Sequence, residues 1–284
     1  MPRLIDAGGI SPIALAELVE YLESPAFDPD DEESFAAAGP WLARLGANRD
    51  FLADLAIAEL KNRFRLQSER NAYGAQVMMV HAPGRKYFIR ANFWPASHET
   101  VMRASGAAPF FYGVAHDHNF SFLTVGYKGP GYWSDYYEYD YDAAAGVPGE
   151  AVALRFIERS RLAEGKLMLY RAHRDVHRQL PADSLSVSLN IMAASPRTPW
   201  LDQYRFDVDH GRIDGILSHS ASEALLTLAA HFGGPDAFDV AHDFARGHPS
   251  GRMRVAALRA VASAAEGLAR LIHRVGPRGL AGVA

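Results

Sequence analysis

The sequence predicts a mainly β protein, in which an antiparallel β-barrel or sandwich lies between two helical segments. The prediction rests on a change in the spacing of apolar residues along the 284-residue chain. Residues 1–75 and 213–284 carry apolar side chains at helical spacing, whereas 76–212 contain short apolar or alternating runs. Because side chains alternate every two residues on a strand but recur every 3.6 residues on a helix, three segments are predicted.

The helices of the terminal segments have recognisable starts and stops. Ser11-Pro12 is a capping residue followed by proline at the first helical position, and Pro25 ends the helix that follows. Trp41 lies in a second, short helix, and Asn48 is a suitable cap for a third. Helices return near the C-terminus, where we expect them to dock on the barrel, around residues 224–228, 238–244 and 253–261.

The middle segment contains seven runs with the length and alternation of strands. Turn signals such as Pro83-Gly84, Gly129-Pro130-Gly131 and Val147-Pro148-Gly149 separate them. Short strands at this spacing are typical of an antiparallel barrel or sandwich. The predicted strands are 77–80, 87–90, 121–125, 133–141, 151–154, 166–170 and 185–191.

Composition excludes several classes of function. The formal net charge is −4, so the chain lacks the basic surface that nucleic acids or anionic lipids require. There is no run of 18 apolar residues for a membrane span, and the N-terminus lacks the apolar core of a signal peptide. Cysteine is absent, which excludes disulfides, cysteine nucleophiles and cysteine-held metals. We expect a cytoplasmic protein whose metal, if present, is held by His, Asp or Glu.

Two histidines one residue apart, His116 and His118, are the strongest functional signal. Alternate side chains of a strand point to the same face, so this pair aims two imidazoles at one point, as two ligands of one metal require. The segment 172–178 offers a third ligand, either His173 or His177. These two lie four residues apart and share a face of an extended segment, so spacing alone leaves both open.

The segment from His116 to Gly126 resembles the first motif of the cupin superfamily, in its cysteine dioxygenase-like form. That form has His-x-His without the glutamate of the general motif, and here residues 122 and 123 are Phe and Leu. The second motif is matched by 165–170, Val176-His177-Arg178 and 186–191, which places the third ligand at His177. The resemblance covers about residues 76–195 and implies a cupin-type antiparallel β-barrel flanked by N-terminal and C-terminal α-helices.

The resemblance also implies a substrate-binding arginine. In the thiol dioxygenases, an arginine upstream of the first histidine binds the substrate carboxylate, and Arg90 lies in the matching place. The chain departs from the family elsewhere. Leu123 occupies the region of a cross-linking cysteine, and Asn190 and Met192 stand about where the family has a histidine and a tyrosine. Cysteine is therefore not the expected substrate.

Three neutral imidazoles on one face leave three open octahedral positions. These suit Fe(II) that binds a bidentate substrate and O₂. The same ligands with a water would suit zinc, and Mn, Ni or Cu would also accept them. We therefore predict Fe(II) on His116, His118 and His177.

Further residues are assigned to the substrate or to support of the ligands. Arg90 is costly to bury without an anion, which is either an internal carboxylate such as Glu138 or Asp140, or the substrate carboxylate. Asn92 shares the face of Arg90. The aromatic run 131–141 reads as a packed barrel strand with one or two tyrosines in the pocket, for which we name Tyr137 and Tyr139. The candidates for support of the ligands are His173 and Asp175, together with Asp117.

The predicted function is O₂-dependent oxidation of a small carboxylated substrate, such as an amino acid or a derivative, by a non-haem iron oxygenase. Two alternatives stay open. The first is a metal-cupin isomerase, lyase or hydrolase that does not use O₂. The second is a non-enzymatic module that binds a ligand or a metal. A homodimer is compatible with each, because cupins are often dimers.

Overall fold

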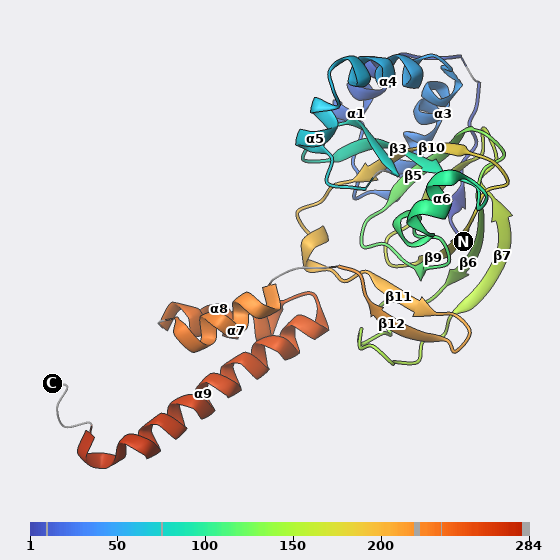
Figure 1. Cartoon of the computed structure of the whole chain (residues 1–284). Coiled ribbons are helices and arrows are strands. Elements are labelled where there is room, and N and C mark those ends of the chain that lie inside the picture. The colour runs from blue at the N-terminus through green and yellow to red at the C-terminus, as the bar shows by residue number, and fades with distance from the viewer. Residues whose placement is uncertain (10, 75, 219–221, 234, 280–284) are drawn as a thin grey trace.

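Two six-stranded sheets, in which every strand pairing is antiparallel, form the centre of the molecule (Figure 1). The computed structural model describes residues 1–9, 11–74, 76–218, 222–233 and 235–279, so the end of the predicted C-terminal segment lies outside the described residues. The predicted fold class is confirmed: the chain is mainly β, with helices before and after the sheets.

The first sheet has the strand order β1 (Arg3–Leu4), β8 (Leu167–Tyr170), β5 (Phe122–Lys128), β10 (Ser186–Ala193), β3 (Tyr87–Trp94) and β2 (Val77–His81). The second has the order β12 (Arg212–Ile216), β11 (Tyr204–Asp207), β4 (Ala115–His116), β9 (Asp175–Leu180), β6 (Trp133–Glu138) and β7 (Arg155–Arg161). Buried side chains of both sheets, including Tyr136 of β6 and Tyr170 of β8, form one cluster between them. Their hydroxyl oxygens lie 3.0 Å apart.

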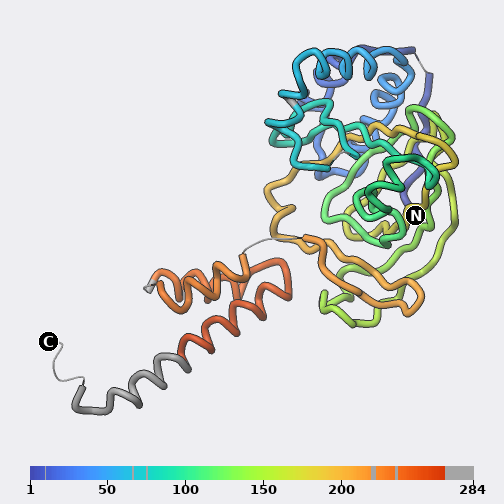
Figure 2. The backbone as a smooth tube through the Cα atoms, in the orientation of Figure 1, coloured from blue at the N-terminus to red at the C-terminus, as the bar shows by residue number. Residues whose placement is uncertain are grey.

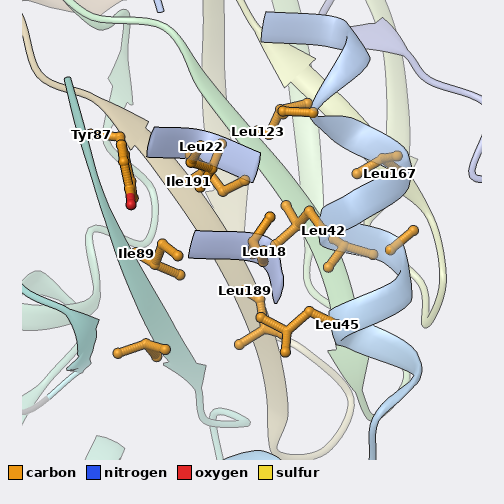
Figure 3. Close-up of a cluster of buried hydrophobic side chains, with 14 of the residues drawn as sticks. Leu18, Leu22, Leu42, Leu45, Tyr87, Ile89, Leu123, Leu167, Leu189 and Ile191 are labelled. Atoms are coloured by element: carbon orange, nitrogen blue, oxygen red, sulfur yellow. The ribbon is translucent and has the colours of Figure 1, made fainter. Parts of the chain in front are cut away.

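The N-terminal helices cover the outer face of the first sheet. They are α1 (Leu15–Glu23), α2 (Glu32–Ala37), α3 (Gly39–Ala47), α4 (Phe51–Lys61) and α5 (Arg65–Arg70). Leu18 and Leu42 of the helices pack in one core with Ile89, Leu189 and Ile191 of the strands (Figure 3). The helical segment and the sheet therefore share a hydrophobic core and stabilise each other.

We expect Leu189→Ala to lower the free energy of unfolding by about 2–5 kcal/mol, because Leu189 is fully buried between the sheet and the helices and its loss leaves a cavity. Leu185→Ala is the control, since Leu185 stands just before the same strand and is 48% exposed. Urea titrations of the two variants measure the difference. Equal losses would show that the helices do not bury this face in solution.

The alternation of strands β3 and β10 turns polar residues toward the second sheet. Ile89, Ala91, Leu189 and Ile191 belong to the core beneath the helices. Their neighbours Arg90, Asn92 and Asn190 consequently face the other way. The strand register places Asn190 directly opposite Arg90. The interior wall of the barrel is therefore polar at this point, although its outer face is apolar.

The C-terminal helices α7 (Ser222–Phe232), α8 (Pro235–Gly247) and α9 (Gly251–Gly279) pack around one another and lie to one side of the sheets, with α9 extending away from them (Figure 2). Arg252 of α9 joins them to the body of the protein through a 2.9 Å ion pair with Asp202, which is buried. None of the described helices is both long and apolar enough to cross a membrane.

Several strands differ from those predicted. Residues 151–154 do not form a strand, because Ala151 makes only an isolated bridge with Arg212. The edge strands β7 and β12, and β11 beside β12, were not predicted. The edge strand β7 contains Arg155, Glu158, Arg159 and Arg161 and has no fully buried residue, so it lacks the apolar alternation that marks a half-buried strand.

Candidate metal centre

Three buried histidines converge between the sheets. The Nε2 atom of His177 lies 3.1 Å from Nε2 of His118 and 3.2 Å from Nε2 of His116. Among the described residues, these three are the group of His, Asp and Glu side chains whose ligand atoms gather closely enough to hold one metal ion, all within 4.8 Å. Bonds of about 2.0–2.1 Å from imidazole nitrogens to one metal give separations of this size.

Strand pairing brings two of the histidines together. His116 ends β4 and is the register partner of His177 on β9. His118 lies two residues beyond, where the chain is no longer in the sheet but continues extended, and its carbonyl accepts a 2.8 Å hydrogen bond from the His173 backbone N–H. The His-x-His spacing therefore works as predicted, although only its first residue belongs to a strand.

The protonation state of the histidine rings favours the binding of a cation. The Nδ1 atom of His116 lies 2.9 Å from the Val114 carbonyl oxygen, so Nδ1 carries the proton and Nε2 keeps its lone pair. Burial lowers the pKa of His116 to about 4, and burial together with the neighbouring imidazoles lowers the pKa of His118 well below its usual value. A neutral imidazole has one ring nitrogen lone pair that it can give to a metal. A divalent cation would satisfy all three at once.

Acidification is expected to destabilise the metal-free protein. The unfolded chain binds a proton at His116 below about pH 6.5, whereas the folded chain does so only below about pH 4. Above pH 6.5, His116 therefore has no effect on the pH dependence of the free energy of unfolding. As the pH drops from 6.5 toward 4, the free energy of unfolding falls by up to about 1.4 kcal/mol per pH unit because of this residue. Urea titrations in chelator at pH 7.5 and 5.0 measure it, and the loss should be smaller for His116→Phe. Equal losses for both proteins would contradict the expectation.

A cavity of about 340 Å³ opens beside the three histidines. Its opposite wall is the polar interior face of the first sheet, with Arg90, Asn92 and Asn190. Gln179, two residues after His177 on the same strand, lines it as well. Aromatic rings, among them Trp94, Phe122 and Tyr132, form most of the remaining surface.

Arg90 has no acidic partner in the part of the chain that is described. Glu138 is engaged by the N-terminal amine, Arg155 and Arg171, and Asp140 accepts a hydrogen bond from the backbone of Asp142. The Arg90 guanidinium instead lies 4.7 Å from the centre of the Tyr73 ring. Its Nε atom is buried without a hydrogen-bond partner, and burial lowers its pKa. Neither of the internal carboxylates that the sequence suggested therefore offsets the cost of burying the Arg90 guanidinium.

The other predicted site residues lie away from the cavity. Tyr139 donates a 2.5 Å hydrogen bond to Asp117, and Tyr137 packs against Phe156 on the outer side of the second sheet. Asp175 binds the side chain of Arg171 at 2.7 Å. None of these three residues lines the cavity. On β6, alternation turns Tyr136 rather than Tyr137 toward the interior, whereas Asp175 shares the face of His177 on β9 but is engaged by Arg171.

His173 is likewise separate from the three histidines that converge. Its ring packs against that of Tyr141 in a tilted arrangement with 3.9 Å between ring centres, and its backbone is in the left-handed region with φ of 58°. This turn conformation breaks the extended geometry in which residues four apart would share a face.

The lining of the cavity includes residues that the sequence did not predict for the site, among them Tyr73, Tyr132, Gln179 and Asn190. Gln179 had a usable signal, since residues two apart on a strand share a face and His177 was identified. Asn190 was noted only as a departure from the family pattern. Its position opposite Arg90 depends on strand pairing, which the sequence does not show.

No protein-family model and no curated protein sequence matches this chain. Solved structures with a related shape include hydroquinone 1,2-dioxygenase from Sphingomonas sp. TTNP3 with 4-hydroxybenzoate bound, at TM-score 0.28 and 12% identity over 46% of this chain and 72% of that one. DMSP lyase DddQ from Ruegeria pomeroyi DSS-3 has a TM-score of 0.27 and 11% identity over 70% and 79%. L-ribose isomerase from Acinetobacter sp. DL28 has a TM-score of 0.20 and 13% identity over 52% and 80%. Likenesses this distant carry no functional argument, so the site rests on its own geometry.

Proposed function

We propose that this protein is a cupin-type, non-haem Fe(II) enzyme that uses O₂ to oxidise a small carboxylated substrate. His116, His118 and His177 would hold the iron. The observation that carries the proposal is the convergence of three buried, neutral imidazoles on a cavity whose far wall presents the guanidinium of Arg90, which has no acidic partner among the described residues. One wall thus suits a metal, and the other suits an anion.

The residues of the cavity would have different roles in the reaction. Iron, when bound, would supply the redox chemistry with O₂ at the positions that the histidines leave open. Arg90 would bind the substrate carboxylate through two parallel hydrogen bonds and so fix its orientation. The aromatic walls, including Phe122 and Tyr132, exclude bulk water and so strengthen both electrostatic interactions.

The titratable groups of the cavity favour oxidation over chemistry driven by a protein base. Among the described residues that line it, no Asp, Glu or Lys is present. Burial raises the pKa of Tyr132 far above neutrality, so this hydroxyl keeps its proton. A metal-cupin isomerase or lyase that needs a protein base to remove a proton therefore has a poor candidate here.

Metal analysis combined with oxygen uptake tests the proposal. We expect protein purified without oxygen and reconstituted with Fe(II) to bind about one iron per chain and to consume O₂ only when a small carboxylate is added. Iron binding without substrate-dependent uptake across a panel of hydroxy, amino and keto acids would support the non-oxidative enzyme instead. Failure to bind any transition metal would contradict both forms of enzyme.

A further inference from the structure

Besides Nδ1 of His177, four buried polar atoms of the described residues that line the cavity have no hydrogen-bond partner: Nε of Arg90, Oδ1 of Asn92, Oε1 of Gln179 and Nδ2 of Asn190. Asn92, Gln179 and Asn190 are 6%, 6% and 3% exposed. Buried polar atoms in native proteins are nearly always paired, and leaving one unpaired costs about 1–3 kcal/mol. Four such atoms on one small cavity indicate a ligand that supplies the missing hydrogen bonds.

The amides require a ligand with hydrogen-bond donors as well as acceptors. A carboxamide has an acceptor oxygen and a donating nitrogen, and the atoms without a partner are the oxygens of Asn92 and Gln179 and the nitrogen of Asn190. A carboxylate alone supplies acceptors only, which suit Arg90 and the amino side of Asn190. The carbonyl oxygens of Asn92 and Gln179 need an O–H or N–H from the ligand.

The three amides lie between Arg90, where the carboxylate of a ligand would bind, and the histidines. Asn190 faces Arg90 across the β3–β10 pair, and Asn92 follows Arg90 on the same face of β3. Gln179 comes from the opposite sheet, where it follows His177 on the same face of β9. A ligand whose carboxylate lies at Arg90 and which extends toward the histidines therefore passes these amides.

The charge of the cavity decides between a hydroxyl and an ammonium donor. Arg90 is cationic, because a guanidinium keeps its proton at neutral pH. The described lining residues include no carboxylate that would offset it. A bound divalent metal would add further positive charge. An ammonium group would be repelled here, whereas a neutral hydroxyl would not.

We propose that the ligand of this cavity is a small hydroxycarboxylate rather than an amino acid. Arg90 and Asn190 donate hydrogen bonds to the carboxylate, and Asn92 and Gln179 accept hydrogen bonds from hydroxyl groups. The proposal rests on the proposed function in that it places the substrate carboxylate at Arg90. It makes Asn92, Gln179 and Asn190 specificity-determining residues.

The test is calorimetric binding, under anaerobic conditions at pH 7, of three probes of similar size: glycerate, propionate and serine. We expect glycerate to bind at least tenfold tighter than either of the others, since one hydrogen bond of about 1.4 kcal/mol is worth a factor of ten. Propionate lacks the hydroxyls, and serine carries the ammonium group. Serine that binds as tightly as glycerate would overturn the proposal.

Substitutions identify the atoms responsible. Asn92→Leu and Gln179→Leu are expected to reduce glycerate binding to the level of propionate, and Arg90→Met to weaken all three probes. Asn62→Leu is the control, because Asn62 is exposed at the end of α4. An unchanged ratio of glycerate to propionate affinity in Asn92→Leu and Gln179→Leu would show that water alone fills these positions, and would overturn the assignment.

Two further measurements keep the outcomes distinct. Asn92→Leu replaces an unsatisfied buried amide by an apolar group, so its melting temperature should match or exceed that of the wild type, and loss of binding is then not loss of fold. Asn92→Asp supplies a carboxylate and should shift the preference from glycerate toward serine, and no shift would count against the charge argument. Selective glycerate binding without oxygen uptake would contradict the proposed oxygenase but uphold this inference.

Discussion

His177→Ala is expected to reduce bound iron from about one per chain to near zero and to lower substrate-dependent oxygen uptake at least 100-fold. His177 is the central member of the cluster, because its Nε2 atom contacts those of both other histidines. Two remaining imidazoles would hold iron weakly, since substitutions that merely disturb the orientation of a ligand already cost 10–100-fold in metal affinity. Elemental analysis after dialysis measures the loss.

His173→Ala is the matched control. His173 also belongs to the 172–178 segment, but its ring packs on Tyr141 and its backbone N–H, which the substitution keeps, supports the carbonyl of His118. We expect iron content close to that of the wild type in this variant. Loss of iron in His173→Ala with retention in His177→Ala would make His173 the third ligand and would contradict the structure.

Arg90→Met is expected to raise the KM for the carboxylated substrate at least 100-fold and, at the same time, to stabilise the free protein. Two charge-assisted hydrogen bonds to a carboxylate are worth about 1.5–3 kcal/mol each, which accounts for the loss of binding. In the free protein the guanidinium is buried without an anion, so an apolar side chain of similar length should raise the free energy of unfolding by about 1–3 kcal/mol.

Arg90→Lys separates charge from geometry. Lysine keeps the positive charge but cannot make the paired hydrogen bonds of a guanidinium, so an intermediate KM is expected. Steady-state kinetics and urea titrations on the same samples provide both quantities. Unchanged KM in Arg90→Met, or a loss of stability in that variant, would mean that Arg90 serves the fold through its contact with Tyr73 rather than the substrate.

Much of the metal centre follows from local sequence. Chain connectivity fixes the His-x-His spacing, and His177 lies in a short extended run whose local pattern resembles a known motif. Arg90 is identified by the same resemblance, from its place upstream of the first histidine, while its cost on an apolar strand left an internal carboxylate and a substrate carboxylate both open. Such arguments use only neighbours in the chain and strand alternation, so they do not depend on the rest of the fold.

The wall of the cavity opposite the histidines could not be found in this way. The prediction of Tyr137 and Tyr139 selects the outward-packing face of the aromatic run 131–141, whereas Tyr132 of the same run lines the cavity, and no local signal distinguishes two faces that are both aromatic. Asn190 reaches the cavity because β10 lies between β3 and β5 in the sheet, although some 100 residues separate β10 from β3 in the chain. Strand order of this kind depends on long-range pairing.

The sequence alone predicts the fold class and the His-x-His pair from periodicity and residue chemistry, which act over a few neighbouring positions, and the family resemblance adds His177 and Arg90. Only the tertiary structure shows that the histidine nitrogens meet, that Arg90 has no acidic partner among the described residues and that Asn92, Gln179 and Asn190 line the same cavity. Those facts depend on which strands pair and which faces are buried. Both are set by the packing of the whole chain around one core rather than by any segment of it.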